Sequence, residues 1–268
     1  MANQYTPGIQ EKYNKAIEEY INSKESLTKI CKIYHTDRAI LSKKLKERGY
    51  EVINQQNLVK LNENFFDTID NEHKAYWLGF MYADGNISSH KPNYKKQYEI
   101  EISLKSSDIH HLEKFCIDLD FRKKLYKDDI RCRVTFRNKH MWETLNIQGC
   151  FPNKSLILKF PTIEQVPEQW QPAFVRGYID GDGSIMINTL GTAPRLSVLG
   201  TKEFLVTMRK VMGWKENKIQ HPSNAYSVEW SGKYVEQYLD QLYANADIYL
   251  DRKYEKYLYI KNVLLPSK

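Results

Sequence analysis

Apolar and polar residues recur with two different periods along this chain. Up to about residue 53 the apolar positions are three or four residues apart, as in helices that bury one face. Farther on, strand-like stretches with a period of two, such as Tyr98–Leu104, are mixed with helical stretches. Between these regions Asn54–Asn57 is polar and aperiodic. We therefore predict an all-α domain over residues 1–53, a linker over 54–60 and a larger α+β region.

The N-terminal domain is predicted to contain three helices. The first covers residues 9–22. In the second, four apolar residues fall on one helical face: Leu27, Ile30, Cys31 and Tyr34. After a short turn, Thr36 or Asp37 is placed to cap the third helix. This helix spans Arg38–Arg48 and is expected to end at Gly49 in a left-handed conformation.

The polar face of the third helix is basic and contains Arg38, Lys43, Lys44, Lys46 and Arg48. Two helices joined by a short turn, with the second one basic, are typical of helix-turn-helix domains that bind DNA. A small helical bundle whose lysines only keep it soluble is the alternative, and it remains open at this point.

Composition and charge limit the possible functions. The chain has 268 residues, is 41% hydrophobic and carries a net charge of +7. The hydrophobic content is sufficient for a folded core, and the positive charge favours a polyanionic partner. The four cysteines are scattered, which argues against a zinc ribbon or a disulfide scaffold. The N-terminus lacks a signal-peptide pattern, and no apolar run approaches the roughly 18 residues of a membrane span. We expect a cytoplasmic protein of a bacterial or phage-infected cell, neither secreted nor bound to a membrane.

The region beyond residue 60 contains an internal repeat. Trp77–Gly85 (WLGFMYADG) and Val175–Gly183 (VRGYIDGDG) are apolar helical stretches that end in Asp-Gly and are followed by a small polar residue and isoleucine. Landmarks downstream also correspond: Phe136, Met141, Leu145 and Lys154 match Trp230, Val235, Leu239 and Lys253. Such matches predict a duplicated domain, with the two copies over residues 61–163 and 164–268.

Each motif places a carboxylate at the end of a helix. Gly79 and Ala83, like Gly177 and Gly181, are four residues apart and form a smooth strip along which two helices are able to approach closely. The glycines after the motifs, Gly85 and Gly183, are expected to end the helices in a left-handed conformation. Asp84 and Asp182 then lie at adjacent helix C-termini, where the helix dipoles and their own charges oppose them. A divalent cation with oxygen ligands, backbone carbonyls among them, would offset this charge.

With these two motifs, residues 60–268 resemble the single-chain LAGLIDADG homing endonucleases. The resemblance implies two pseudo-symmetric αββαββα domains, whose motif helices form the interface and whose saddle-shaped antiparallel sheets sit in the DNA major groove. It implies that Asp84 and Asp182, with the carbonyls of Ala83 and Gly181, bind Mg²⁺ or Mn²⁺. It also implies that a lysine late in each half positions the attacking water. These lysines are Lys154 and either Lys253 or Lys256. The sixth motif residue is Asp180 in the second copy but Tyr82 in the first, so the two halves are expected to be unequal.

Basic residues along the predicted strands are candidates for DNA contact. In Ile130–Phe136 basic and apolar residues alternate, so that one face of the strand is charged and the other is buried. Such a face suits phosphates and base edges, although an ordinary solvated face has the same pattern. The candidates in the larger region are Lys91, Lys95, Lys96, Lys105, Arg122, Lys124, Arg131, Arg133, Arg195 and Lys218.

Other candidate sites are weaker. His110 and His111 are adjacent and so do not share a helical face, and we expect an exposed polar surface there rather than a metal site. There is no GxxxxGK[ST] phosphate loop. The sequence as a whole predicts a monomeric, site-specific endonuclease that cuts double-stranded DNA with divalent metal ions. A DNA- or RNA-binding regulator or intron maturase with the same fold but without cleavage remains the alternative. Retention of both Asp84 and Asp182 favours the enzyme.

Overall fold

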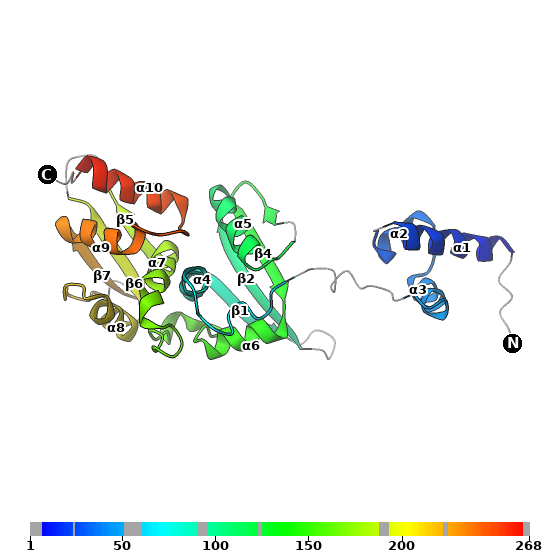
Figure 1. The fold of residues 1–268 in the computed structure, drawn as a ribbon, viewed down its shortest axis with the longest axis horizontal. Helices are drawn as coiled ribbons and strands as arrows, with labels where there is room; N and C mark the ends of the chain where they lie inside the picture. The colour runs from blue at the N-terminus through cyan, green and yellow to red at the C-terminus, as the bar shows by residue number, and fades with distance from the viewer. Residues whose placement is uncertain are drawn as a thin grey trace. The chain divides into compact units, whose positions relative to one another are not determined.

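The computed structural model describes residues 7–23, 25–50, 61–90, 96–122, 125–187, 193–221 and 225–264. The chain divides into two compact units, residues 1–60 and 61–268, which we call the smaller unit and the larger unit (Figure 1). The predicted linker, residues 54–60, lies outside the described residues. Within the larger unit we call residues 61–163 the first half and residues 164–268 the second half, a division that remains a prediction.

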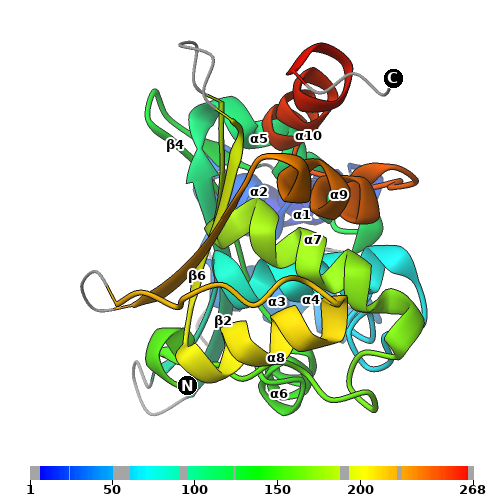
Figure 2. The ribbon, with the colours of Figure 1, turned by 90° about the vertical axis from the view of Figure 1, so that its left-hand side faces the viewer.

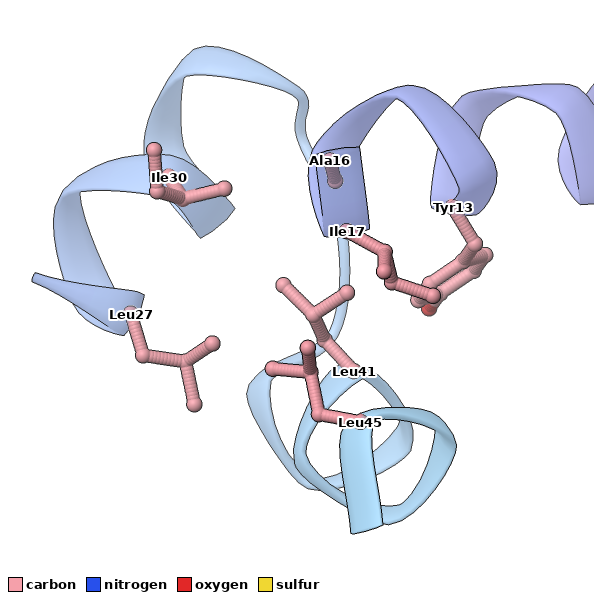
Figure 3. Close-up of a cluster of buried hydrophobic side chains, with 7 residues drawn as sticks. All are labelled: Tyr13, Ala16, Ile17, Leu27, Ile30, Leu41 and Leu45. Atoms are coloured by element: carbon pink, nitrogen blue, oxygen red, sulfur yellow. The ribbon is translucent and has the colours of Figure 1, made fainter. Parts of the chain in front are cut away.

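The smaller unit contains the three predicted helices: α1 (Pro7–Asn22), α2 (Leu27–Ile33) and α3 (Arg38–Glu47). Ser26 caps α2, and the Asp37 side chain caps α3 by accepting a hydrogen bond from the Ile40 amide at 2.9 Å. Gly49 follows α3 with the expected positive φ, at 80°. Figure 3 shows the buried side chains that hold the helices together: Tyr13, Ala16, Ile17, Leu27, Ile30, Leu41 and Leu45.

The first half has the predicted αββαββα order. Its helices are α4 (Glu72–Ala83), α5 (Ile109–Asp118) and α6 (Lys139–Ile147). Its strands are β1 (Gly85–His90), β2 (Gln97–Lys105), β3 (Tyr126–Lys127) and β4 (Arg131–Arg137). The antiparallel sheet has the order β1-β2-β4-β3. Short 3₁₀ turns occupy Ser106–Asp108 and Lys154–Leu156.

Among the described residues the second half repeats this order with one strand fewer and one helix more. Its helices are α7 (Gln171–Asp182), α8 (Lys202–Met212), α9 (Lys233–Tyr243) and α10 (Asp251–Tyr259), with a short 3₁₀ turn at Glu168–Trp170 and a π-helical end at Ile260–Leu264. Its strands are β5 (Gly183–Met186), β6 (Arg195–Gly200) and β7 (Tyr226–Ser231), in the antiparallel order β5-β6-β7. Where four strands were predicted, the described residues before β7 make a single bridge, Gln220 with Ser227.

The two halves meet along α4 and α7, which run side by side in Figure 2. A Cβ atom on Gly79 would lie 1.9 Å from the Phe174 carbonyl oxygen, and one on Gly177 would lie 1.9 Å from the Tyr76 carbonyl oxygen. No residue other than glycine fits at these contacts without moving a helix. The predicted close approach of the glycine strips is therefore confirmed, and it is reciprocal.

The motif helices are also enclosed on their other sides. The residues of α4 from Ala75 to Tyr82 are all buried, and so are Phe174, Val175, Tyr178 and Ile179 on α7. A helix that is apolar all round is normally a core helix or a membrane span. At 12 residues α4 is a core helix, and no helix in the described part of the chain is both long and apolar enough to cross a bilayer.

Candidate active site

The two motif aspartates lie where each motif helix ends. Asp84 follows the last residue of α4, and its amide donates to the Phe80 carbonyl at 2.9 Å. Asp182 is the last residue of α7. The following glycines are not left-handed, contrary to the prediction: Gly183 has φ −89° and ψ 158°, and Gly85 is not among the glycines with positive φ. They are required for space, since a Cβ on Gly85 would lie 2.6 Å from Met81 and one on Gly183 would lie 2.6 Å from the Ile179 carbonyl.

The two motif helices end close to one another. A Cβ on Gly181, the residue before Asp182, would lie 2.3 Å from the Ala83 Cβ and 3.4 Å from Asp84 Cγ. Asp84 reaches solvent and Asp182 is half-buried, but the surrounding protein removes part of their hydration. This burial, and then the charge of Asp182, raises the pKa of Asp84 to about 6. Burial also raises the pKa of Asp182, against the opposing effect of Lys154 and Lys253.

Each half brings its predicted lysine to the end of its own motif helix. The Lys154 amino group donates to the Gly85 carbonyl. The Lys253 amino group donates to the carbonyls of Gly183, Ile179 and Asp180 at 2.5–2.7 Å. Gly85 and Gly183 are equivalent motif positions, so Lys253 is the counterpart of Lys154. Lys256 donates to the Ile185 carbonyl instead. Burial lowers the pKa of Lys253 to about 8.

The donor set at the helix ends fits a hard divalent cation. Among the described residues no hydrogen bond or ion pair involves the carboxylate of Asp84 or Asp182. The carbonyls of Ala83 and Gly181 belong to the last helical turns, where intrahelical partners run out. No group of three or more His, Cys, Asp or Glu side chains forms in the described parts of the chain, so a cation here would have two carboxylates and backbone oxygens.

The outer face of the first sheet carries three of the predicted DNA-contacting residues. Lys105 lies directly opposite Arg131, and Arg133 lies opposite Ser103, while Cys132 and Val134 point into the core. The predicted alternation in this strand is confirmed. Arg133 is 3.6 Å from Glu101 and stacks over the Tyr126 ring at 5.1 Å, whereas neither Lys105 nor Arg131 forms an ion pair with a described residue.

The remaining DNA-contact candidates are scattered. Lys96, Arg122, Arg195 and Lys218 are exposed, and Arg195 is 3.5 Å from Glu229 on the second sheet. In the smaller unit Arg38, Lys43 and Lys46 are exposed on α3, whereas Lys44 is half-buried and faces α1, where it lies 5.7 Å from the Tyr13 ring centre. Lys91, Lys95 and Lys124 lie outside the described residues. Their roles, like those of all the candidate site residues, remain predictions.

Sequence reasoning missed a buried polar network between the halves. The Asp180 carboxylate accepts hydrogen bonds from the Tyr76 and Tyr243 hydroxyls at 2.7 and 2.6 Å. His111 Nε2 lies 3.0 Å from the Tyr76 hydroxyl. The prediction that His111 is exposed is wrong, because its side chain is only 1% exposed, and burial lowers its pKa to about 3. His110 is exposed, as expected, and it pairs with Glu113. The Asp180–Tyr82 difference was the one signal in the sequence that pointed to this region.

Comparison with known proteins supports the fold. No protein-family model and no curated protein sequence matches the chain. The LAGLIDADG homing endonuclease I-LtrWI, solved bound to target DNA, is 13% identical with a TM-score of 0.50, over 71% of this chain and 90% of that one. The meganuclease I-SmaMI, bound to uncleavable DNA, is 9% identical with a TM-score of 0.50, over 69% of this chain and 87% of that one. This likeness, the αββαββα order and the paired glycine helices lead to one conclusion: the chain has the two-domain fold of the LAGLIDADG homing endonucleases.

Proposed function

We propose that the protein is a site-specific endonuclease that hydrolyses phosphodiester bonds in double-stranded DNA with the help of Mg²⁺ or Mn²⁺. One observation carries the proposal. Asp84 and Asp182 meet at two helix ends without a described protein partner, and their pKa values are raised there. Two carboxylates side by side at helix C-termini are unfavourable on their own account, because the helix dipoles and their own charges oppose them. Beside a divalent cation and phosphates they have an evident use.

The residues around the carboxylates suit this chemistry. Divalent ions bound by Asp84 and Asp182 would supply a polarised water and neutralise charge on the phosphate. The carboxylates hold and orient such ions, and the carbonyls of Ala83 and Gly181 add neutral donors. Lys154 and Lys253 keep an amino group at each helix end, where a positive charge stabilises an anionic phosphate.

The charged sheet face of the first half is the proposed contact with DNA. Lys105 and Arg131 are paired across two strands and have no described anionic partner, so they are available to phosphates. Arg133 is held by the Tyr126 ring, which suits a planar contact with a base edge. Two motif helices within one chain complete the site, so we propose that the protein acts as a monomer.

The smaller unit is proposed to be an additional DNA-binding module of helix-turn-helix type. Helices α2 and α3 are joined by a short turn, and α3 exposes Arg38, Lys43 and Lys46. Its hydrophobic core consists of residues from its own three helices. Contacts from this unit would add affinity through phosphates.

The test is cleavage of DNA by the purified full-length protein. Rounds of binding to double-stranded oligonucleotides with a randomised central segment enrich a target, which is then incubated with Mg²⁺, Mn²⁺ or Ca²⁺. We expect double-strand cleavage with Mg²⁺ or Mn²⁺ and binding without cleavage in Ca²⁺. Asp84→Asn and Asp182→Asn should each abolish double-strand cleavage while leaving affinity within about tenfold, because affinity comes from many phosphate contacts.

Asp118→Asn is the matched control for these variants. Asp118, the last residue of α5, is a carboxylate that accepts from Trp77 Nε1 at 2.6 Å and pairs with His73 at 2.8 Å, and both partners lie more than one turn before Asp84 along α4. It should retain cleavage. Full cleavage by the Asp84 or Asp182 variant would contradict the assignment of that carboxylate. Selective binding without cleavage by the parent protein in every ion would instead support a regulator that does not cut.

A further inference from the structure

The sixth residue of each motif forms a hydrogen bond to the segment that carries the lysine of its own half. This residue is Tyr82 in the first half and Asp180 in the second. Both side chains are buried. The two residues share neither size nor charge, and nothing in the sequence explains why such different side chains occupy equivalent positions.

In the first half Tyr82 holds the chain after α6. Its hydroxyl donates to the Gln148 carbonyl at 2.5 Å. The next residue, Gly149, has φ 95°, and a Cβ there would lie 2.0 Å from the Tyr82 hydroxyl oxygen. Glycine is therefore required at this position for Tyr82 to reach the backbone. Cys150 is bound to the same helix, since its Sγ lies 3.4 Å from the Met81 carbonyl. This anchored segment leads directly to Lys154.

In the second half Asp180 holds the start of α10. Its carboxylate accepts a hydrogen bond from the Leu250 amide at 2.8 Å, in addition to those from Tyr76 and Tyr243. Leu250 is the residue that precedes α10, and Lys253 lies in the first turn of that helix. A carboxylate at a helix N-terminus is favoured by the helix dipole. Asp180 therefore anchors the first turn that carries Lys253.

We propose that Tyr82 and Asp180 are equivalent positioning residues, each of which holds the lysine of its own half against the end of the motif helix. Tyr82 does so by donating to a carbonyl and Asp180 by accepting from an amide. The inference rests on the proposed nuclease function, and it assigns one DNA strand to each half. Each lysine donates to the carbonyl of its motif's last glycine, Gly85 or Gly183. A shift of the anchored segment withdraws the amino group, and misplacement by about 1 Å costs up to roughly a hundredfold in rate.

Strand-resolved cleavage distinguishes positioning from general stability. The probe is the selected oligonucleotide, labelled on either strand, with Lys154→Met and Lys253→Met as references. Tyr82→Phe should slow the strand that Lys154→Met slows, by about tenfold or more, and leave the other strand within about twofold. Asp180→Asn should slow the strand that Lys253→Met slows. An amide offers one acceptor oxygen to three donors, so the Leu250 bond is weakened.

Two controls match these changes chemically. Tyr178→Phe removes a buried hydroxyl that donates to the Leu199 carbonyl at 2.9 Å, and Asp118→Asn changes a carboxylate that accepts from Trp77. Neither bond involves a segment that carries a lysine. Both controls should lower stability without favouring either strand. Equal slowing of both strands by Tyr82→Phe or by Asp180→Asn would overturn the proposal.

Hydrogen exchange tests positioning without any reference to cleavage. In the full-length protein Tyr82→Phe should speed amide exchange over residues 148–156 and leave 250–256 unchanged, while Asp180→Asn should do the reverse. Unchanged exchange in the anchored segment would overturn the proposal even if the parent cuts DNA. If the parent does not cut DNA but exchange changes as expected, the endonuclease function fails while the anchoring stands.

Discussion

Replacing Gly79 with alanine is expected to destabilise the larger unit by forcing α4 away from α7. The new Cβ would lie 1.9 Å from the Phe174 carbonyl oxygen and 2.8 Å from its carbonyl carbon, where 3.4–4 Å is ordinary van der Waals contact. Both atoms belong to helix backbone, so no side-chain rotation relieves the clash. The helices would have to separate by roughly 1.5 Å.

The change in the free energy of unfolding caused by Gly79→Ala is the sum of two opposing contributions. Overpacking at a buried contact costs about 3 kcal/mol when neither partner is able to move aside. Alanine is a better helix former than glycine and returns about 1 kcal/mol. The free energy of unfolding should therefore fall by about 2 kcal/mol. With an m value of about 2 kcal/mol per molar urea, the unfolding midpoint should fall by about 1 M.

Tryptophan fluorescence during urea unfolding measures this midpoint. All five tryptophans lie beyond residue 60, so the signal reports only on the larger unit. Gly8→Ala on α1 is the control, because nothing lies within 4 Å of the added Cβ, and it should leave the midpoint unchanged. An unchanged or higher midpoint in Gly79→Ala would refute the argument that direct backbone contact requires glycine here.

Three further predictions follow from other parts of the molecule. Deleting residues 1–53 should shorten the DNase footprint at one end. If about three phosphate contacts are lost, the slope of log K against log salt should become shallower by about 2.7. An unchanged footprint and slope would contradict the DNA-binding role of the smaller unit. Replacing Lys105 and Arg131 together with glutamine should make that slope shallower by about 1.8. Arg195→Gln should change the slope less, because Arg195 already pairs with Glu229. Equal changes would contradict the proposal that the sheet of the first half supplies most of the phosphate contacts. Burial lowers the pKa of His111 to about 3, below its ordinary 6.5, so the folded protein favours the neutral imidazole. The contribution of this neutral side chain to the free energy of unfolding is therefore complete above pH 6.5 and is lost as the pH falls toward 3. Between pH 7 and pH 5 the free energy of unfolding should therefore fall by about 2 kcal/mol more in the parent than in His111→Gln, and parallel pH curves in urea unfolding would refute this.

The parts of the fold that were predictable depend on residues with narrow physical requirements. Only glycine permits the direct contacts at positions 79 and 177, so the repeat that defines the interface was visible in the sequence. The alternation in β4 was equally clear, because one face of that strand is buried and the other meets solvent. These features also predicted that the two aspartates would meet.

Other features depend on tertiary context that the sequence does not display. Lys253 and Lys256 are three residues apart on one helix, so spacing alone does not decide which one reaches the motif, and the structure resolves this through the Gly183 carbonyl. The burial of His111 depends on which side of α5 faces Tyr76. Among the described residues the second sheet has three regular strands, and residues 215–221, which have no period-two alternation, form a single bridge to β7 instead.

The reciprocal contact of α4 with α7 has a consequence for the symmetry of the proposed DNA target. Each helix places its glycine on the backbone of the other, which is how a surface pairs with its own copy around a two-fold axis. Two identical chains joined in this way would have to recognise a palindrome, because half-sites mirror protein symmetry. Covalent connection of the halves removes that constraint, and Asp180 in one motif against Tyr82 in the other shows that the two halves have diverged. A target of the proposed endonuclease is therefore free to differ between its left and right halves.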